Sequence, residues 1–237
     1  MRKVIAIGCS ILLLATTVFS QKDKDKEIKI EGSGNVITKD VAIQPFDQLE
    51  ANGVFNVVLT QGNKESLKIE AEDNLQALFE IKNEGSKLMV DMKKDSHFNS
   101  KKKMTVYITF KNLKSIDLKM VGNVSSEGNL NFSDLSLANK SVGSVDLALN
   151  AQKLDINNKS VGNLRLSGKA ENAIIRSNSV GAIKASDLLV QTMDIDNDGV
   201  GSAEVNAVKE LKVKDSFLGK VKNAGSATAK RINKVVI

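Results

Sequence analysis

The sharpest local candidate for chemistry in the sequence is an aspartate triplet. Asp194, Asp196 and Asp198 alternate along the chain and a glycine follows them, which is similar to the start of a calcium-binding loop. The twelfth position of such a loop requires a bidentate glutamate, and Val205 occupies it here. The triplet also aligns with an ordinary alternating segment at residues 154–162. We therefore expect a solvated strand face here, with calcium as the weaker alternative.

The sequence offers little material for acid–base catalysis or for a zinc site. His97 is the single histidine, and it lies in a lysine-rich stretch, where a surface role is more common than a role as general base. Cys9 is the single cysteine. Because zinc sites need several histidine or cysteine ligands, we expect no zinc and no cofactor.

Basic residues gather around residues 95–100. They are Lys93, Lys94, Lys101, Lys102 and Lys103. We expect a solvated hairpin loop here, and contact with an anionic lipid or polysaccharide is the alternative. The formal net charge of the chain is only +6, without a strong basic stripe or interleaved aromatic residues. Nucleic acid is therefore not an expected partner.

A repeat fills the second half of the chain and sets the elements that position these residues. An aliphatic residue followed by glycine recurs every 18–21 residues, with the glycines at Gly122, Gly143, Gly162, Gly181, Gly201 and Gly219. Apolar residues alternate on both sides of each glycine, which is typical of strands with one buried face. Such units bury their apolar faces only by stacking. The spacing predicts an all-β parallel β-helix (β-solenoid) with about 19–20 residues per coil and two main strands per coil.

Two polar columns follow from this register. Asn139, Asn158 and Asn197 lie four residues before a turn glycine, with Ser177 and Asp215 as substitutes, and they could stack as a ladder between coils.

The second column bears on catalysis, because glycan-cleaving β-helices need clustered carboxylates on one sheet face. The third residue after each glycine gives a column of mixed charge, consisting of Asp146, Arg165, Lys184 and Glu204. We expect this column to be a surface charge ladder and the chain not to be an enzyme.

The first half is also predicted to be mostly strand. Alternating segments lie at residues 28–43, 48–60, 66–71 and 104–110, a hairpin is predicted at 82–92, and a short helical turn is predicted at 73–78. We expect residues 28–112 to continue the stack as an irregular N-terminal coil region. The repeat solenoid, residues 113–237, follows without a break.

The N-terminus predicts export. Residues 1–20 combine a positive end, an apolar run and a small final residue, as a signal peptide does, and residues 21–27 form a charged, flexible stretch. A lipoprotein signal ending at Cys9 is disfavoured, because few apolar residues precede it. The run is too short to span a membrane, and no second apolar segment exists. We expect an exported protein without a transmembrane span, in the periplasm, on the outer cell surface or secreted.

Several short segments carry a family resemblance. The sequences GSGNV at 32–36, FDQLE at 46–50, NGVFNV at 52–57 and LTQG at 59–62 resemble the head GIN domain family of putative adhesins, which is common in exported proteins of Bacteroidetes-type bacteria. The resemblance runs from Gly32 to the C-terminus. Phe55 stands where the family usually has isoleucine, and Ser-Val-Gly replaces its usual Gly-Ser-Gly turns. The resemblance implies a right-handed β-helix, similar in shape to pectin lyases, with no recognised catalytic residues and a role in cell-surface adhesion.

These observations favour a non-catalytic adhesion or scaffold module that presents a β-solenoid face. Two alternatives remain open: a polysaccharide-active lyase or hydrolase on the same architecture, and a spacer without a ligand of its own. The expected partner is a cell-surface or extracellular glycan or protein. The sequence is silent on self-association.

Overall fold

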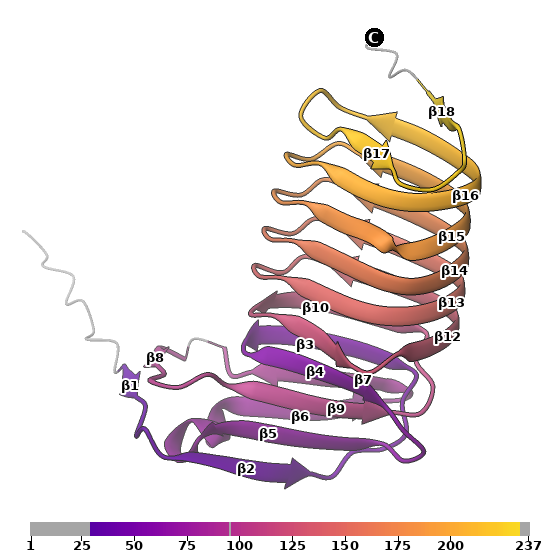
Figure 1. The fold of residues 1–237 in the computed structure, drawn as a ribbon. Helices are drawn as coiled ribbons and strands as arrows, with labels where there is room; N and C mark the ends of the chain where they lie inside the picture. Colours follow the sequence, from indigo (N-terminus) through magenta and orange to yellow (C-terminus); the bar gives the residue numbers. More distant parts are fainter. Residues whose placement is uncertain (1–28, 95, 233–237) are drawn as a thin grey trace, which may run out of the picture.

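The structure, a computed structural model, describes residues 29–94 and 96–232, and Figure 1 shows a stack of β-coils. The predicted signal peptide with Cys9, and the charged stretch at 21–27, lie outside the described residues. Within the described part, the one helical element is the 3-10 helix η1 (Asp73–Leu78), at the predicted helical turn. In those same residues no helix is long and apolar enough to cross a bilayer.

The repeat coils stack in parallel, as predicted. Their long strands are β12 (Leu130–Asn139), β13 (Val145–Asn158), β14 (Leu164–Ser177), β15 (Ile183–Asn197) and β16 (Ala203–Asp215). Equivalent residues of neighbouring coils lie side by side, so that Ile156 pairs with Ile175 and Ile175 with Ile195. The two strands predicted for each coil are joined into one strand of 13–15 residues in β13, β14, β15 and β16. This strand bends at one edge of the stack, and the glycine turns close the coil at the other edge (Figure 1).

Period-2 alternation separates the interior from the surface. Ile156, Leu164, Ile175 and Ile183 are buried, as the sequence predicts, in one core that extends from Phe46 to Ala227. Their strand neighbours point to solvent, including Asp155, Arg165, Arg176 and Lys184. The stack is therefore stabilised mainly by apolar surface buried inside the coils.

The first half continues the stack only in part. β3 (Gln48–Val54) and β4 (Asn56–Gln61) form a coil that pairs in parallel with β10 (Ser115–Val121) and β11 (Val124–Glu127). β7 (Lys87–Met92) and β9 (Thr105–Phe110) add parallel strands on the other side. Beyond these, β2 (Val36–Val41), β5 (Ser66–Glu72) and β6 (Phe79–Glu84) pair antiparallel and cover the end of the stack. Short strands complete the fold: β1 (Ile30–Glu31), β8 (Phe98–Asn99), β17 (Val221–Asn223) and β18 (Ala229–Arg231).

The polar ladder predicted between coils is present inside the stack. Asn139, Asn158, Ser177 and Asn197 are all buried and occupy equivalent positions. Asn139 Nδ2 donates to Asn158 Oδ1 at 2.8 Å, and Asn158 Nδ2 donates to Ser177 Oγ at 3.4 Å. Asn197 Nδ2 donates to the carbonyl oxygen of Gly219 at 2.8 Å. These bonds satisfy polar groups that burial would otherwise destabilise.

The turn glycines explain why the repeat signature contains glycine. Gly122, Gly143, Gly162, Gly181 and Gly201 have φ between 137° and 148°, and a Cβ on each would overlap backbone of the preceding coil. Other residues rarely adopt this region of φ. Gly219 differs from the expected pattern, because its φ is not positive and its neighbours are the carbonyl oxygens of Asn197 and Gly199. The last coil thus closes with a different turn.

Candidate functional site

The aspartate triplet lies on a strand and the turn that follows it. Asp194 and Asp196 are on the outer face of β15, and Asp198 is exposed beyond its end. Lys214 on β16 pairs with Asp196, with 3.1 Å between Nζ and Oδ2, and Lys212 lies opposite Asp194. Lysine ammonium groups thus occupy the surface where calcium would need further oxygen ligands. The described residues contain no group of three or more His, Cys, Asp or Glu side chains placed to hold a metal.

The lysine-rich loop is not a hairpin, which corrects the sequence prediction. The strands that flank it pair with different partners, β7 with β3 and β9 with β4, because the loop crosses from one side of the coil to the other. Its middle forms β8, which pairs in parallel with β1. Its lysines, Lys93, Lys94, Lys101, Lys102 and Lys103, are all exposed, as is His97. This segment therefore presents an exposed basic surface.

A buried carboxylate fixes this loop to the N-terminal segment. Glu72, at the end of β5, is fully buried and accepts hydrogen bonds from Ser100 Oγ at 2.6 Å, Gly34 N at 2.6 Å and Lys101 N at 2.9 Å. The bond from Ser100 is the main cause that lowers the pKa of Glu72. Gly32 packs directly against the carboxylate, so that a Cβ there would overlap it. All three donors are backbone or hydroxyl groups, and they come from two chain segments, so Glu72 acts as a structural anchor.

One carboxylate cluster escaped the sequence analysis. Glu50 on β3 and Asp117 on β10 both bind Lys119, with Nζ–O distances of 3.1 and 2.9 Å, and Lys87 lies 3.5 Å from Glu50. The hydrogen bond to Asp117 is the main cause that raises the pKa of Lys119, which keeps its proton. Nearby, burial raises the pKa of Asp91. A lysine fixed between two carboxylates serves an ion-pair network better than proton transfer.

An exposed aliphatic column runs along the glycine-turn edge. Most of its members directly precede a turn glycine, and Val54 pairs with the first of these across the coils. The members are Val54, Val121, Val142, Val161, Val180, Val200 and Leu218. Each side chain is 45–60% exposed. The five valines from Val121 to Val200 pair directly from coil to coil, and Gly201 N donates to the carbonyl oxygen of Leu218. We call these seven residues the aliphatic column.

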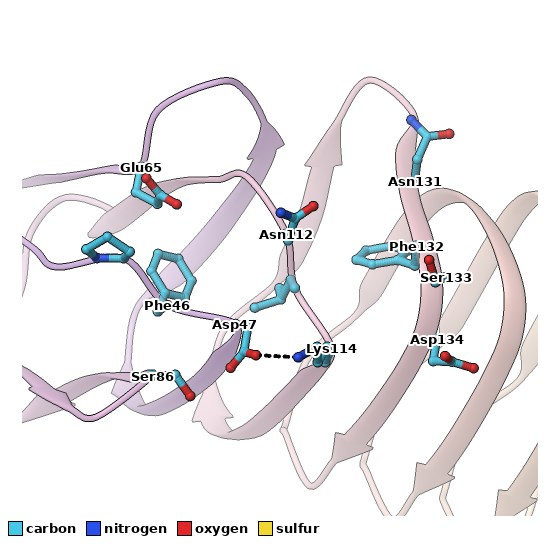
Figure 2. A pocket seen from close by; sticks show the side chains of 12 residues that line it. Phe46, Asp47, Glu65, Ser86, Asn112, Lys114, Asn131, Phe132, Ser133 and Asp134 are labelled. Atoms are coloured by element: carbon cyan, nitrogen blue, oxygen red, sulfur yellow. Dashed lines mark hydrogen bonds and ion pairs between the residues drawn. The ribbon is translucent and has the colours of Figure 1, made fainter.

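A hollow of about 600 Å³ lies where the first half meets the repeat coils (Figure 2). Phe46, Leu113 and Phe132 form its apolar part, and Phe132 stacks on Phe110 with 5.9 Å between ring centroids. At one side Lys114 Nζ donates to Asp47 Oδ2 at 2.8 Å. The hydrogen bond from Lys114 is the main cause that lowers the pKa of Asp47. This pair links the residue before β3 to the residue before β10, and it leaves neither charge free.

A second hollow of about 580 Å³ adjoins the first and shares Asn131 and Phe132 with it. It extends over Ala151 and Ala170, which occupy the position of Phe132 in the next coils. The hollow exists because alanine replaces phenylalanine in this column. We call the two hollows together the junction groove. Along the chain, its residues lie about half a coil from those of the aliphatic column.

Sequence signals for these surfaces were present but incomplete. Asn158 and Ser160 are buried, so alternation along the chain places Val161 on the outer surface. Alternation alone could therefore have predicted the aliphatic column. The junction groove and the Glu50–Asp117–Lys119 cluster instead join residues of different coils. Glu50 and Lys119 are 69 positions apart, and no local pattern connects them.

Comparisons with known proteins agree on family and fold. A family model described as "Putative auto-transporter adhesin, head GIN domain" matches residues 45–227. A solved structure of a putative adhesin from Bacteroides fragilis is 31% identical, with a TM-score of 0.73 over 86% of this chain and 100% of the other. A putative adhesin from Parabacteroides merdae, at 20% identity, shares the fold with a TM-score of 0.52 over 86% of this chain and 99% of the other. No curated protein matches.

Proposed function

Because the chain belongs to the head GIN domain family of putative auto-transporter adhesins, we propose that it is an exported, non-catalytic adhesion module. It acts in the cell envelope or on the outer surface, and the aliphatic column is its contact surface. The observation that carries this proposal is the unbroken exposure of aliphatic side chains along the turn edge, from Val54 to Leu218.

The aliphatic column is more than scattered surface hydrophobicity. Seven stacked positions at a strand spacing of about 4.8 Å give an apolar strip of roughly 30 Å. The side chains stack on one another, yet about half of each remains in contact with water. Contiguous apolar strips of this kind usually mark interaction sites. A pure spacer would gain nothing from presenting one.

The charged groups support the non-catalytic part of the proposal. Glu50 and Asp117 are bound by Lys119, and Asp47 is bound by Lys114. Asp196 is bound by Lys214. Each of these carboxylates forms an ion pair with a lysine ammonium group at 2.8–3.1 Å, whereas a glycan-cleaving carboxylate has to face the glycosidic bond. These pairs are better suited to fixing the coils in register than to chemistry.

Threonine substitutions in the aliphatic column test the contact surface. The triple variant Val142→Thr, Val161→Thr and Val180→Thr keeps β-branched shapes and removes apolar surface. Beads coated with purified protein should adhere to cell envelopes of the source bacterium, and the triple variant should lose at least about tenfold in retained beads. The matched control is Ile174→Thr, on an exposed aliphatic residue outside the column. Unchanged retention in the triple variant would refute the contact surface.

Cell fractionation tests the export part. The full chain should be recovered outside the cytoplasm, with a mature N-terminus at Gln21 by mass spectrometry. An uncleaved chain confined to the cytoplasm would contradict export.

The non-catalytic part predicts no new reducing ends and no unsaturated products from neutral or acidic polysaccharides. Turnover that disappears in Asp194→Ala or Asp196→Ala, with the fold intact, would overturn it.

A further inference from the structure

We propose that the junction groove is a binding site for a neutral oligosaccharide. Its two hollows, of about 600 and 580 Å³, share Asn131 and Phe132 and so adjoin along the stack. Each volume lies within the range of small-molecule sites. The groove passes from the first coil onto the repeat coils, which suits a chain-like ligand rather than a compact one.

The floor of the groove is apolar and stepped. Phe132 is held in place by its stacking on Phe110. Ala151 and Ala170 occupy the same column in the next coils, and the floor is deeper there because their side chains are smaller. All three floor residues are less than one-tenth exposed, so they offer flat patches rather than protruding rings. The C–H face of a sugar ring can lie on such patches, because it is the apolar side of an otherwise polar ligand.

The rim of the groove supplies amide groups from successive coils. Asn131, Asn150 and Lys169 lie side by side across β12, β13 and β14. Asn150 Nδ2 donates to Asn131 Oδ1 at 3.0 Å, and Gln61 Oε1 accepts from Asn131 N at 2.8 Å. These bonds fix the orientation of the Asn131 and Asn150 side chains at the rim. Amides both donate and accept, and this dual capacity matches hydroxyl groups.

The charges around the groove disfavour an acidic ligand. Lys114 is bound to Asp47, and the other charged lining residues are three carboxylates and one lysine: Glu65, Asp134, Glu171 and Lys169. A polyanion would meet an excess of carboxylates. A neutral sugar avoids this repulsion, and the amides of the rim match its hydroxyl groups.

Titration of the purified mature protein with defined hexasaccharides tests the proposal. The probes are neutral hexamers of glucose, mannose, xylose and galactose, with hexagalacturonate as the acidic comparison, and isothermal titration calorimetry gives the affinity. At least one neutral hexamer should bind saturably. Ala151→Phe, which repeats the residue of the preceding coil and fills the hollow, should weaken this binding at least about tenfold, as should Asn150→Ala.

The controls separate this site from other causes. Asn157→Ala, on the outer face of the same strand, should bind as the wild type does, and thermal unfolding should show that all variants fold. No saturable binding to any neutral hexamer would overturn the proposal, as would binding that survives both Ala151→Phe and Asn150→Ala, or binding to hexagalacturonate alone. The triple threonine variant of the aliphatic column should retain sugar binding. The failure of either proposal is therefore visible independently of the other.

Discussion

At the scale of single residues, the interior of this protein depends on polar side chains as well as apolar ones. Asn158 accepts hydrogen bonds from Asn139 Nδ2 at 2.8 Å and from Ser160 Oγ at 2.8 Å, and it donates to Ser179 Oγ at 3.1 Å. Its neighbours cannot turn to water, because all of them are buried. The ladder therefore fixes the register between coils. The apolar core does not, because apolar contacts have no preferred direction and allow neighbouring coils to slide.

Asn158→Ala should lower the free energy of unfolding by about 2–5 kcal/mol, because it leaves the donors of Asn139 and Ser160 buried without an acceptor. Urea denaturation followed by circular dichroism measures this loss. The matched control is Asn157→Ala, on the exposed neighbour, which should change stability by less than about 0.5 kcal/mol. Equal effects of the two substitutions would show that the ladder does not stabilise the stack.

Glu72 makes the attachment of the lysine-rich loop sensitive to acid. The hydrogen bond from Ser100 is the main cause that holds its folded-state pKa below the ordinary value of 4.5. The contribution of Glu72 to stability is therefore complete above pH 4.5 and declines as the pH falls through the lower folded-state pKa. Hydrogen exchange at Gly34 N and Lys101 N should accelerate in acid beyond its intrinsic pH dependence. In Glu72→Gln this acceleration should be absent, and its persistence there would contradict the role of Glu72.

At the scale of elements, the turns at Gly122, Gly143, Gly162, Gly181 and Gly201 need glycine for two reasons. Gly162 has φ of 141°, and a Cβ would overlap the carbonyl oxygen of Gly143 in the preceding coil. Gly162→Ala should therefore destabilise the protein by roughly 3 kcal/mol or more. The control is Gly85→Asn, at a positive-φ turn with open space around it, which should cost under about 1 kcal/mol. The measurement is the urea midpoint at constant slope. A loss below about 1 kcal/mol for Gly162→Ala would mean that the turn can relax.

The strands of the first half show how far sequence patterns reach. Alternation predicted segments at the positions of β3, β5 and β9, and the Glu84–Gly85 turn predicted the β6–β7 hairpin. Alternation identifies the buried face of a strand but not its partner or direction. The antiparallel pairing of β2 with β5 was therefore not predicted, and neither was the pairing of β1 with β8.

At the scale of the whole molecule, the repeat made the stack predictable and the surfaces only partly so. The near-identical signatures at 140, 159 and 178 set the coil length, and the coil length sets the cross-coil neighbours, including Asp146 with Arg165. The second hollow of the junction groove arises instead from one difference in size between Phe132 and Ala151. Such a difference in side-chain size predicts a hollow only when the register between the two coils is known.

The C-terminal end of the stack should be less stable than its middle. Each coil contacts only its neighbours, so stability is close to a sum of coil and interface contributions, and unfolding begins at the weaker end. At the C-terminal end the strands shorten to three residues in β17 and in β18, whereas β14 has 14. Hydrogen exchange by mass spectrometry should therefore show protection that decreases from β14 toward Arg231.

Paired core truncations test whether this gradient reflects a one-dimensional stack. Val213→Ala, in β16, should accelerate exchange in β16 to β18 and leave β13 unchanged, because only the terminal coil needs to open. Ile156→Ala, in β13, should cost about 2–5 kcal/mol and accelerate exchange throughout the repeat coils, since a central coil cannot open without separating the stack. Both side chains are buried, at 1% and 0% exposure, so each truncation leaves a cavity in the core, and the comparison concerns where exchange accelerates rather than by how much. Equal acceleration across all coils in both variants would show that the protein unfolds as one cooperative unit.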